Sequence, residues 1–464
     1  MADAHGLRVV LVSTYELGRQ PFGLASPAAW LESIGASVRC LDLAVEKLDE
    51  ASVQEADLVA FYVPMHTATR LAVSTVQCVQ RINPAAHLCF YGLYAPVNEP
   101  YLRQLGADTI LGGEFEAGLA SLAARLAAGD DHDAAQPEPV VSLGRQRFKL
   151  PSRSGLPSLE RYAFLEVAPG IRRTVGYTEA TRGCKHLCRH CPIVPVYKGN
   201  FRVVQRDVVL EDIRQQVRAG AEHITFGDPD FFNGPTHAVA IVEALHSEFP
   251  EISYDVTIKI EHLRQHAKLL PLLRDTGCAF VTSAVESVDP KILEIFDKRH
   301  TRDDFIEVVR RFREIGLTLN PTFVTFTPWT TLRGYLDLLE LLVELDLIDN
   351  VAPIQYAIRL LIPAGSRLLD LAETHEVVQR YDKEALFHSW VHPDPRVDRL
   401  CETVLDIVRK SQSEGLNRRA VLARVWEAAV SAYDGAVSER LAVAHLNQAP
   451  PRAAVPYLSE PWYC

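Results

Sequence analysis

The chain has 464 residues, which is enough for two or three domains that each bury a core of their own. Hydrophobic residues make up 48% and charged residues 23%, as in an ordinary globular protein, and the formal net charge of −11 comes without any lysine- or arginine-rich run. This composition argues against a nucleic-acid partner, and the lack of a signal peptide or of an apolar stretch of about 18 residues argues against a membrane partner and predicts a cytoplasmic location.

Residues 1–127 alternate short β-rich runs with helical patterns. We expect strands at 7–14, 37–43, 58–64, 87–94 and 109–113, and helices at 26–35, 67–82, 100–106 and 115–129. Nearly continuous apolar strands with helical crossovers indicate an α/β fold with a parallel, doubly wound sheet, that is, a Rossmann-like (flavodoxin-like) domain. Such sheets bind ligands beyond the carboxyl ends of their strands, which here are the loops 13–18, 63–66 and 112–116.

Residues 128–169 are rich in Asp, Pro, Ser and Gly without a sustained period, and are predicted to be a linker. The alternation of strands and helices resumes over 170–371, with strands expected at 176–183, 223–231, 253–260, 279–287, 319–327 and 354–361. Six such units form a partial (β/α)6 barrel of the TIM type, in which chemistry is built at the C-terminal ends of the strands. Residues 372–464 are predicted to be a helical region with a proline-punctuated tail.

Three of the nine cysteines, Cys184, Cys188 and Cys191, lie close together just after the first expected barrel strand. The other six are scattered, so a disulfide scaffold is not expected. A zinc site could combine the three thiolates with His186 or His190, but structural zinc usually takes two C-x2-C-like knuckles and no second knuckle follows. A [4Fe–4S] cluster on three thiolates would leave one iron open to a substrate or a cofactor.

This spacing after the first barrel strand resembles the radical S-adenosylmethionine (radical SAM) superfamily. The resemblance implies that Cys184, Cys188 and Cys191 each bind one iron, and that the amino and carboxylate groups of S-adenosylmethionine (SAM) chelate the fourth. It also implies SAM contacts from residues near the cluster and at the ends of later strands: His190, Gly227, Asp228, Asp230, Lys259, Glu286 and Ser287. His190 is a departure, because the superfamily more often has an aromatic ring there.

Structural alternatives stay open for several of these residues. Asp228 and Asp230 could form an Asp-Pro turn with a helix cap, and Glu286 could be an acid at a helix N-terminus. Lys259, on an otherwise apolar strand, either points into the site or extends its ammonium outward to solvent.

The doubly wound domain ahead of the barrel resembles that of cobalamin-binding radical SAM proteins, whose first loop carries Asp-x-His-x-x-Gly. Here Gly18 remains, but the acid and the cobalt-ligating histidine are missing. The resemblance therefore implies cobalamin only without a histidine lower ligand, with contacts from Tyr15, Gly18, Met65, Gly112 and Gly113. The alternative is a sheet domain that kept its shape and lost its ligand.

Nearly the whole chain, in segments 21–31, 64–72, 92–116, 188–204 and 459–464, resembles a radical SAM group with a tail reading Cys-Sec-Ala-Glu-Pro or Cys-Cys-Ala-Glu-Pro. The resemblance implies that the sequence stops after Cys464 at a UGA codon that is read as selenocysteine. A C-terminal cysteine is the alternative, and the gene sequence beyond codon 464 distinguishes the two.

The expected function is that of a radical SAM enzyme. An electron from a donor such as flavodoxin or ferredoxin would enter the cluster, SAM would be cleaved, and the 5′-deoxyadenosyl radical would abstract hydrogen from a small-molecule or peptide substrate. Cobalamin at the domain interface would make the outcome methyl transfer. The alternative of another class is a non-catalytic iron–sulfur or zinc protein that acts as a binding or sensing module. Trp329 and Arg359 are expected to line the substrate pocket.

Overall fold

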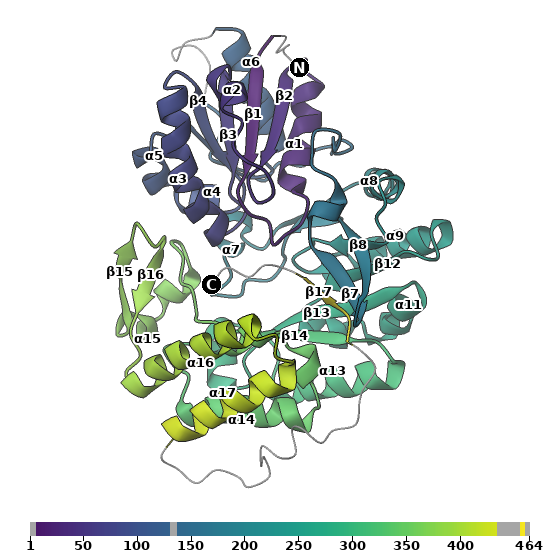
Figure 1. Ribbon diagram of the computed structural model, residues 1–464, viewed down its shortest axis with the longest axis vertical. Coiled ribbons are helices and arrows are strands. Elements are labelled where there is room, and N and C mark those ends of the chain that lie inside the picture. The colour runs from purple at the N-terminus through teal and green to yellow at the C-terminus, as the bar shows by residue number, and fades with distance from the viewer. Residues whose placement is uncertain (1–5, 130–136, 434–454, 460–464) are drawn as a thin grey trace.

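The computed structural model describes residues 6–129, 137–433 and 455–459. A doubly wound N-terminal domain lies at one end of the long axis, and a half-barrel with C-terminal helices packed against it lies at the other (Figure 1). None of the described helices is long and apolar enough to cross a membrane.

The N-terminal domain is built on a parallel sheet with the strand order β2-β1-β3-β4-β5-β6. Its strands are β1 (Arg8–Ser13), β2 (Ser37–Asp42), β3 (Leu58–Tyr62), β4 (His87–Tyr91), β5 (Thr109–Gly113) and β6 (Val141–Ser142). The five expected strands are confirmed, and β6 is a short addition from the linker. The order reverses between β1 and β3, so their carboxyl ends form the switch point where such sheets hold ligands.

Helices cover both faces of this sheet, which is why its strands are apolar on both sides. One face packs against α1 (Phe22–Glu32) and α6 (Glu116–Ala127). The other face packs against α2 (Glu50–Gln54), α3 (His66–Ile82), α4 (Tyr94–Val97) and α5 (Glu99–Gln104).

The half-barrel sheet has the order β14-β13-β12-β11-β8-β7-β17. Five of its strands are parallel: β8 (Ile171–Thr178), β11 (His223–Phe226), β12 (Ser253–Thr257), β13 (Cys278–Glu286) and β14 (Leu319–Phe323). At the β8 edge, β7 (Phe164–Ala168) pairs antiparallel with β8, and β17 (Tyr457–Leu458) pairs antiparallel with β7. The outer helices are α8 (Arg206–Arg218), α9 (Pro235–Glu248), α10 (Ile260–Gln265), α11 (Leu270–Asp275), α13 (Arg302–Ile315) and α14 (Leu332–Glu344).

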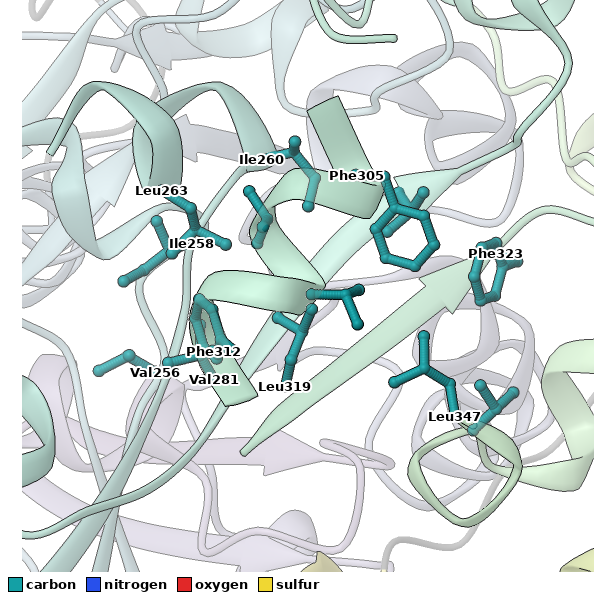
Figure 2. Close-up of a cluster of buried hydrophobic side chains, with 14 of the residues drawn as sticks. Val256, Ile258, Ile260, Leu263, Val281, Phe305, Phe312, Leu319, Phe323 and Leu347 are labelled. Carbon is teal, nitrogen blue, oxygen red and sulfur yellow. The ribbon is translucent and has the colours of Figure 1, made fainter. Parts of the chain in front are cut away.

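The main core lies between this sheet and its outer helices (Figure 2). Helix α13 buries Phe305, Val308, Val309 and Phe312, which recur at the spacing of one helical face. These side chains share one apolar cluster with Val281 of β13 and other strand residues, so the helix holds the strands whose ends carry the site.

The sixth barrel strand, expected at 354–361, is not formed. Residues Pro353–Tyr356 make a 3-10 helix, and a single isolated bridge between Phe326 and Arg359 continues the sheet beyond β14. Pro353 lacks an N–H and favours the start of a helical turn. The side-chain oxygen of Gln355 accepts the hydrogen bond of the Phe323 N–H at 2.9 Å, so a side chain takes the place of a neighbouring strand.

The C-terminal region contains α15 (Ala372–His375), α16 (Pro395–Ser413) and α17 (Arg418–Ala432), together with a hairpin of β15 (Val378–Asp382) and β16 (Phe387–Trp390) that the sequence did not predict. The hairpin reaches the N-terminal domain, because the Tyr381 hydroxyl donates to the side chain of Asn98 at 2.7 Å. Cys464, on which the expectation of a selenocysteine codon depends, lies outside the described residues.

Arg182 connects the two α/β units through a buried ionic cluster. Its guanidinium lies 2.6 Å from the carboxylate of Glu116, on the N-terminal domain, and 2.6 Å from that of Glu179, on the half-barrel. Glu114 lies 3.8 Å away, and burial raises its pKa to about 7. The guanidinium also lies near the rings of Phe22, Phe115 and Phe148. A buried cation between carboxylates of both units fixes how they sit on one another.

Replacing Arg182 with methionine should leave Glu116 and Glu179 buried without their cation. Removing one partner of a buried ion pair costs about 3–5 kcal/mol. We therefore expect Arg182→Met to lower the thermal unfolding temperature, with Arg182→Lys intermediate. Arg218→Met, at an arginine that is 64% exposed, is the matched control. An effect of Arg182→Met no larger than that of the control would contradict this role.

The buried carboxyl group of Asp42, at the end of β2, should make the stability of the protein depend on pH. Its carboxylate accepts a hydrogen bond from the Tyr162 hydroxyl at 2.9 Å, and burial raises its pKa from 3.8 to about 6. Since the folded pKa lies above the unfolded one, this group contributes full stability below pH 3.8 and loses it as the pH rises through about 6. Asp42→Asn keeps an acceptor without the charge.

We expect Asp42→Asn to be more stable than the wild type at about pH 7.5, and this advantage to shrink as the pH falls to about 5. Urea unfolding at the two pH values measures it, with the exposed Glu251→Gln as a control. An advantage that grows on acidification would show that the carboxylate is stabilised in its ionised form.

Candidate functional site

The three clustered cysteines lie in one loop at the C-terminal edge of the half-barrel. The loop begins after β9 (Thr181–Gly183), which pairs antiparallel with β10 (Phe201–Val203), and runs into the short helix α7 (Val194–Tyr197). Gly183 has φ 73°, and a Cβ atom on it would lie 2.3 Å from the Tyr197 ring. Only glycine fits directly before Cys184, and the thiols of all three cysteines are free.

The spread of these thiols fits an iron–sulfur cluster better than zinc. Zn–S bonds of about 2.3 Å in a tetrahedron would hold the sulfur atoms roughly 3.8 Å apart. Among the residues that the structure describes, one set of three donor atoms that could hold a metal ion lies within 4.8 Å of one another. It consists of Cys184, His186 and Asp230, and not of the three cysteines. At least two of the three sulfur atoms therefore lie farther apart than ligands of a single zinc ion would.

Burial of the cysteine loop disfavours bare thiolates. It raises the pKa of Cys184 to about 11 and that of Cys191 to about 12. Bound iron would supply the positive charge that keeps such thiols deprotonated. The residues present therefore fit a [4Fe–4S] cluster with one iron left for SAM.

His186 is held by charged groups that follow β11 and β12 in the chain, and not by the other two cysteines. Its Nε2 atom lies 3.4 Å from an Asp230 carboxylate oxygen, which is also 2.7 Å from Nδ1 of His262. On its other side, Nδ1 lies 3.3 Å from the Lys259 ammonium and 3.5 Å from the Glu261 carboxylate. This buried network places Asp230 and Lys259 beside Cys184, where the sequence predicted SAM contacts.

Lys259 directly follows β12 and caps α10. Its side chain is 7% exposed and its ammonium lies 3.0 Å from the Glu261 carboxylate. The ammonium therefore points toward the cysteine loop and does not extend to solvent.

Asp228 has a different environment from Asp230. Its carboxylate accepts hydrogen bonds from the backbone N–H of Ala180 and from the Thr181 hydroxyl, which ties the end of β11 to the strand that enters the cysteine loop. A Cβ atom on Gly227 would lie 1.8 Å from the Tyr177 hydroxyl. Gly227 and Asp228 thus shape the edge of the barrel with their own neighbours, while Asp230 reaches the cysteine loop.

Glu286 ends β13 and meets His190 across the site. One carboxylate oxygen lies 3.1 Å from Nε2 of His190 and 3.4 Å from the ammonium of Lys298. Despite its burial, Lys298 and His190 lower the pKa of Glu286 to about 2, so it is ionised. His190 does present a flat face, as an aromatic residue would, but its ring stacks on Phe296 with centroids 4.3 Å apart. Ser287 accepts from the Asp289 N–H in the turn that follows.

The sequence did not single out Lys298 or Arg182. Lys298 lies after helix α12 (Pro290–Phe296) and is 4% exposed at its side chain. A lysine that follows an apolar helix end is the signal that could have indicated it, but its partner Glu286 lies on a different element. The pairing needed the tertiary structure.

The residues expected to hold cobalamin do not form an open cradle. A Cβ atom on Gly112 would lie 2.4 Å from the Pro96 ring, and one on Gly113 would lie 2.2 Å from the Ser142 carbonyl oxygen. Tyr15 is buried, at 3% exposure, while Gly18 and Met65 are partly exposed.

Aromatic rings also close this edge of the N-terminal sheet. Tyr62, Tyr91 and Phe115 pack with ring centroids 5.1–6.0 Å apart, and the absent side chain of Gly23 makes room for the Tyr62 ring. His66 hydrogen-bonds to the Ala385 carbonyl at 2.6 Å. The chain's own atoms take up the Cβ side of both predicted glycines, so packing within the domain accounts for Gly112 and Gly113 without a ligand.

Trp329 and Arg359, expected at a substrate pocket, have structural contacts. Arg359 lies over the Trp390 ring at 3.5 Å and pairs with Asp398 at 2.7 Å. Trp329 packs edge-on against Phe296 in a small apolar cluster. Both stabilise the region beyond β14.

The comparisons with known proteins agree with this site. Residues 178–351 match the family model of the radical SAM superfamily. The chain is 25% identical over 327 residues to hopanoid C-3 methylase of Methylococcus capsulatus, which covers 67% of this chain and 62% of that protein. It is 26% identical over 200 residues to tRNA-2-methylthio-N(6)-dimethylallyladenosine synthase of Acetivibrio thermocellus, covering 39% of this chain and 40% of that one.

Two solved structures share the arrangement of both α/β units. The cobalamin-dependent radical SAM enzyme OxsB with aqua-cobalamin bound has a TM-score of 0.63 at 14% identity, over 88% of this chain and 67% of that chain. The methyltransferase TsrM from Kitasatospora setae with cobalamin and a [4Fe–4S] cluster bound has a TM-score of 0.57 at 17% identity, over 73% and 70%. At such identities the likeness shows the fold alone. The chain therefore carries a radical SAM domain, joined to a doubly wound domain as in cobalamin-dependent radical SAM enzymes.

Proposed function

We propose that the protein is a radical SAM enzyme that cleaves SAM reductively and starts radical chemistry on a substrate held at the mouth of the half-barrel. The observation that carries this proposal is the cysteine loop, with three free thiols at the C-terminal edge of the strands, spread more widely than zinc ligands. A [4Fe–4S] cluster bound there would supply one electron to SAM and an open iron for its amino and carboxylate groups.

The residues around the cysteine loop bind and orient SAM and shield the reactive centre from water. Asp230 and Glu286 are ionised carboxylates that contact His186 and His190 of the cysteine loop, and they are suited to the ammonium and the ribose hydroxyls of SAM. Lys259 offers a buried ammonium that suits the SAM carboxylate. Burial of these groups keeps water from the reactive centre, which protects a radical from side reactions.

Cobalamin-dependent methyl transfer is the second candidate. The architecture shared with OxsB and TsrM favours it. The glycine pair gives it no support, because Pro96 and the Ser142 carbonyl take up the Cβ side of Gly112 and Gly113. Under either candidate we propose a small-molecule or peptide substrate and an electron donor such as flavodoxin or ferredoxin.

The cluster assignment predicts iron contents. Alanine at Cys184, Cys188 or Cys191 should abolish both cluster loading and the release of 5′-deoxyadenosine, because each thiol holds a different iron. Cys78→Ser on α3 should leave both unchanged. Iron analysis and electron paramagnetic resonance after anaerobic reconstitution measure loading, and about four irons per wild-type chain are expected. A Cys184→Ala chain that still cleaves SAM would overturn the assignment.

The two candidates differ in cobalamin content. We expect chain expressed with added cobalamin and purified without oxygen to retain far less than one corrinoid per chain, since Pro96 and the Ser142 carbonyl fill the space at the glycine pair. The absorption spectrum of the purified protein gives the content. One cobalamin per chain would instead favour methyl transfer. If a loaded cluster releases no 5′-deoxyadenosine and transfers no methyl group from SAM, a non-catalytic iron–sulfur protein remains.

A further inference from the structure

Lys298 is held in place by strained backbone. Its neighbours Asp297 (φ 53°) and Arg299 (φ 57°) both adopt the left-handed conformation without being glycine, and so does its partner Glu286 (φ 67°). Such conformations are costly for residues with a side chain and persist where the surroundings enforce them, often at functional sites. Three of these residues at one place point to a constraint on where the Lys298 ammonium lies.

The segment that carries Lys298 is tied to the cysteine loop. The backbone N–H of Arg189, between Cys188 and Cys191, donates to the Phe296 carbonyl at 2.9 Å. The Arg189 guanidinium also donates to the carbonyls of Glu294 and Ile295. The end of α12 is thereby fastened to the loop, and a movement of one carries the other.

The ammonium of Lys298 lies beside the ionised carboxylate of Glu286. It is 3.4 Å from Glu286, and attraction to Glu286, Cys188 and Cys191 raises its pKa, so it is charged. His190 shares the same Glu286 oxygen at 3.1 Å, which leaves the second carboxylate oxygen for another donor. Because His190 directly precedes Cys191 and meets the same Glu286 oxygen as Lys298, the charge of Lys298 lies beside the end of the loop that carries Cys191, and one carboxylate partly offsets it.

This geometry has an electrostatic consequence for a bound cluster. Reduction adds one negative charge, and a buried cation nearby stabilises the reduced form more than the oxidised form. Net charge and hydrogen bonding near the sulfur atoms are among the factors that set cluster potentials. A carboxylate beside the cation disfavours the reduced form and so lowers the reduction potential.

We propose that Lys298 is a positioning residue whose fixed charge raises the reduction potential of a cluster on Cys184, Cys188 and Cys191, while Glu286 limits this effect and is held by Lys298 in the orientation that meets SAM. The step concerned is the uptake of one electron by the cluster from an external donor, in which no bond forms or breaks. The inference rests on the proposed function, since it requires a cluster in this loop.

The test is a potentiometric titration of the reconstituted protein without SAM, followed by electron paramagnetic resonance. We expect Lys298→Met to lower the ratio of reduced to oxidised cluster at a fixed potential by at least tenfold, which is 59 mV for a one-electron couple. Glu286→Gln should change the ratio in the opposite direction. The reduction potentials of Lys298→Arg and Lys291→Met should stay close to that of the wild type. Lys291 is an exposed lysine on α12, the helix that Lys298 follows, and serves as the matched control.

The opposite signs separate an electrostatic role from a structural one. Equal potentials in all variants, or shifts of the same sign for Lys298→Met and Glu286→Gln, would overturn the inference. If Lys298→Met does not load a cluster, the test compares Lys298→Arg with Glu286→Gln. An unchanged reduction potential in Glu286→Gln would then overturn the inference. A wild-type chain that loads no cluster would overturn the proposed function as well, whereas a loaded wild type with unshifted variants would overturn this inference alone.

Discussion

The structure depends on the buried guanidinium of Arg182. It sits on β9, two residues before Cys184, and is neutralised by carboxylates from both α/β units. Because a buried cation is stable only with its counter-charges in place, the N-terminal domain cannot swing away without exposing or unpairing it. The strand that enters the cysteine loop is thus the strand that holds the two units together.

A second contact repeats this coupling on the other side of the loop. Val196 and Tyr197 of α7 pack against Val97 of α4, and the Tyr197 hydroxyl donates to Glu114. The cysteine loop is therefore fixed at both ends against the N-terminal domain. This arrangement holds the N-terminal domain against the cysteine loop.

The expectations from sequence succeeded where a signal was local. Strands β1, β3 and β4 are short apolar runs, and a parallel barrel strand lies at or overlaps each of the first five expected positions, although β8 ends at Thr178 and not at 183. The sixth failed because 354–361 is apolar enough for a strand, while Pro353 starts a 3-10 turn and Gln355 caps the edge of β14. The β15–β16 hairpin was missed because it is stabilised by contacts with distant segments, such as that between Tyr381 and Asn98.

Local patterns in the sequence predict the α/β class, the order of its units and the three-cysteine loop, because periodicity and cysteine spacing are short-range properties. The neighbours of those residues follow from the tertiary structure alone. It separated Asp230, at the cysteine loop, from Asp228, which binds Thr181, and it brought Lys298 to Glu286. It also filled the space beside Gly112 and Gly113. Burial and charge pairing arise between segments far apart in the chain, and no local pattern encodes them.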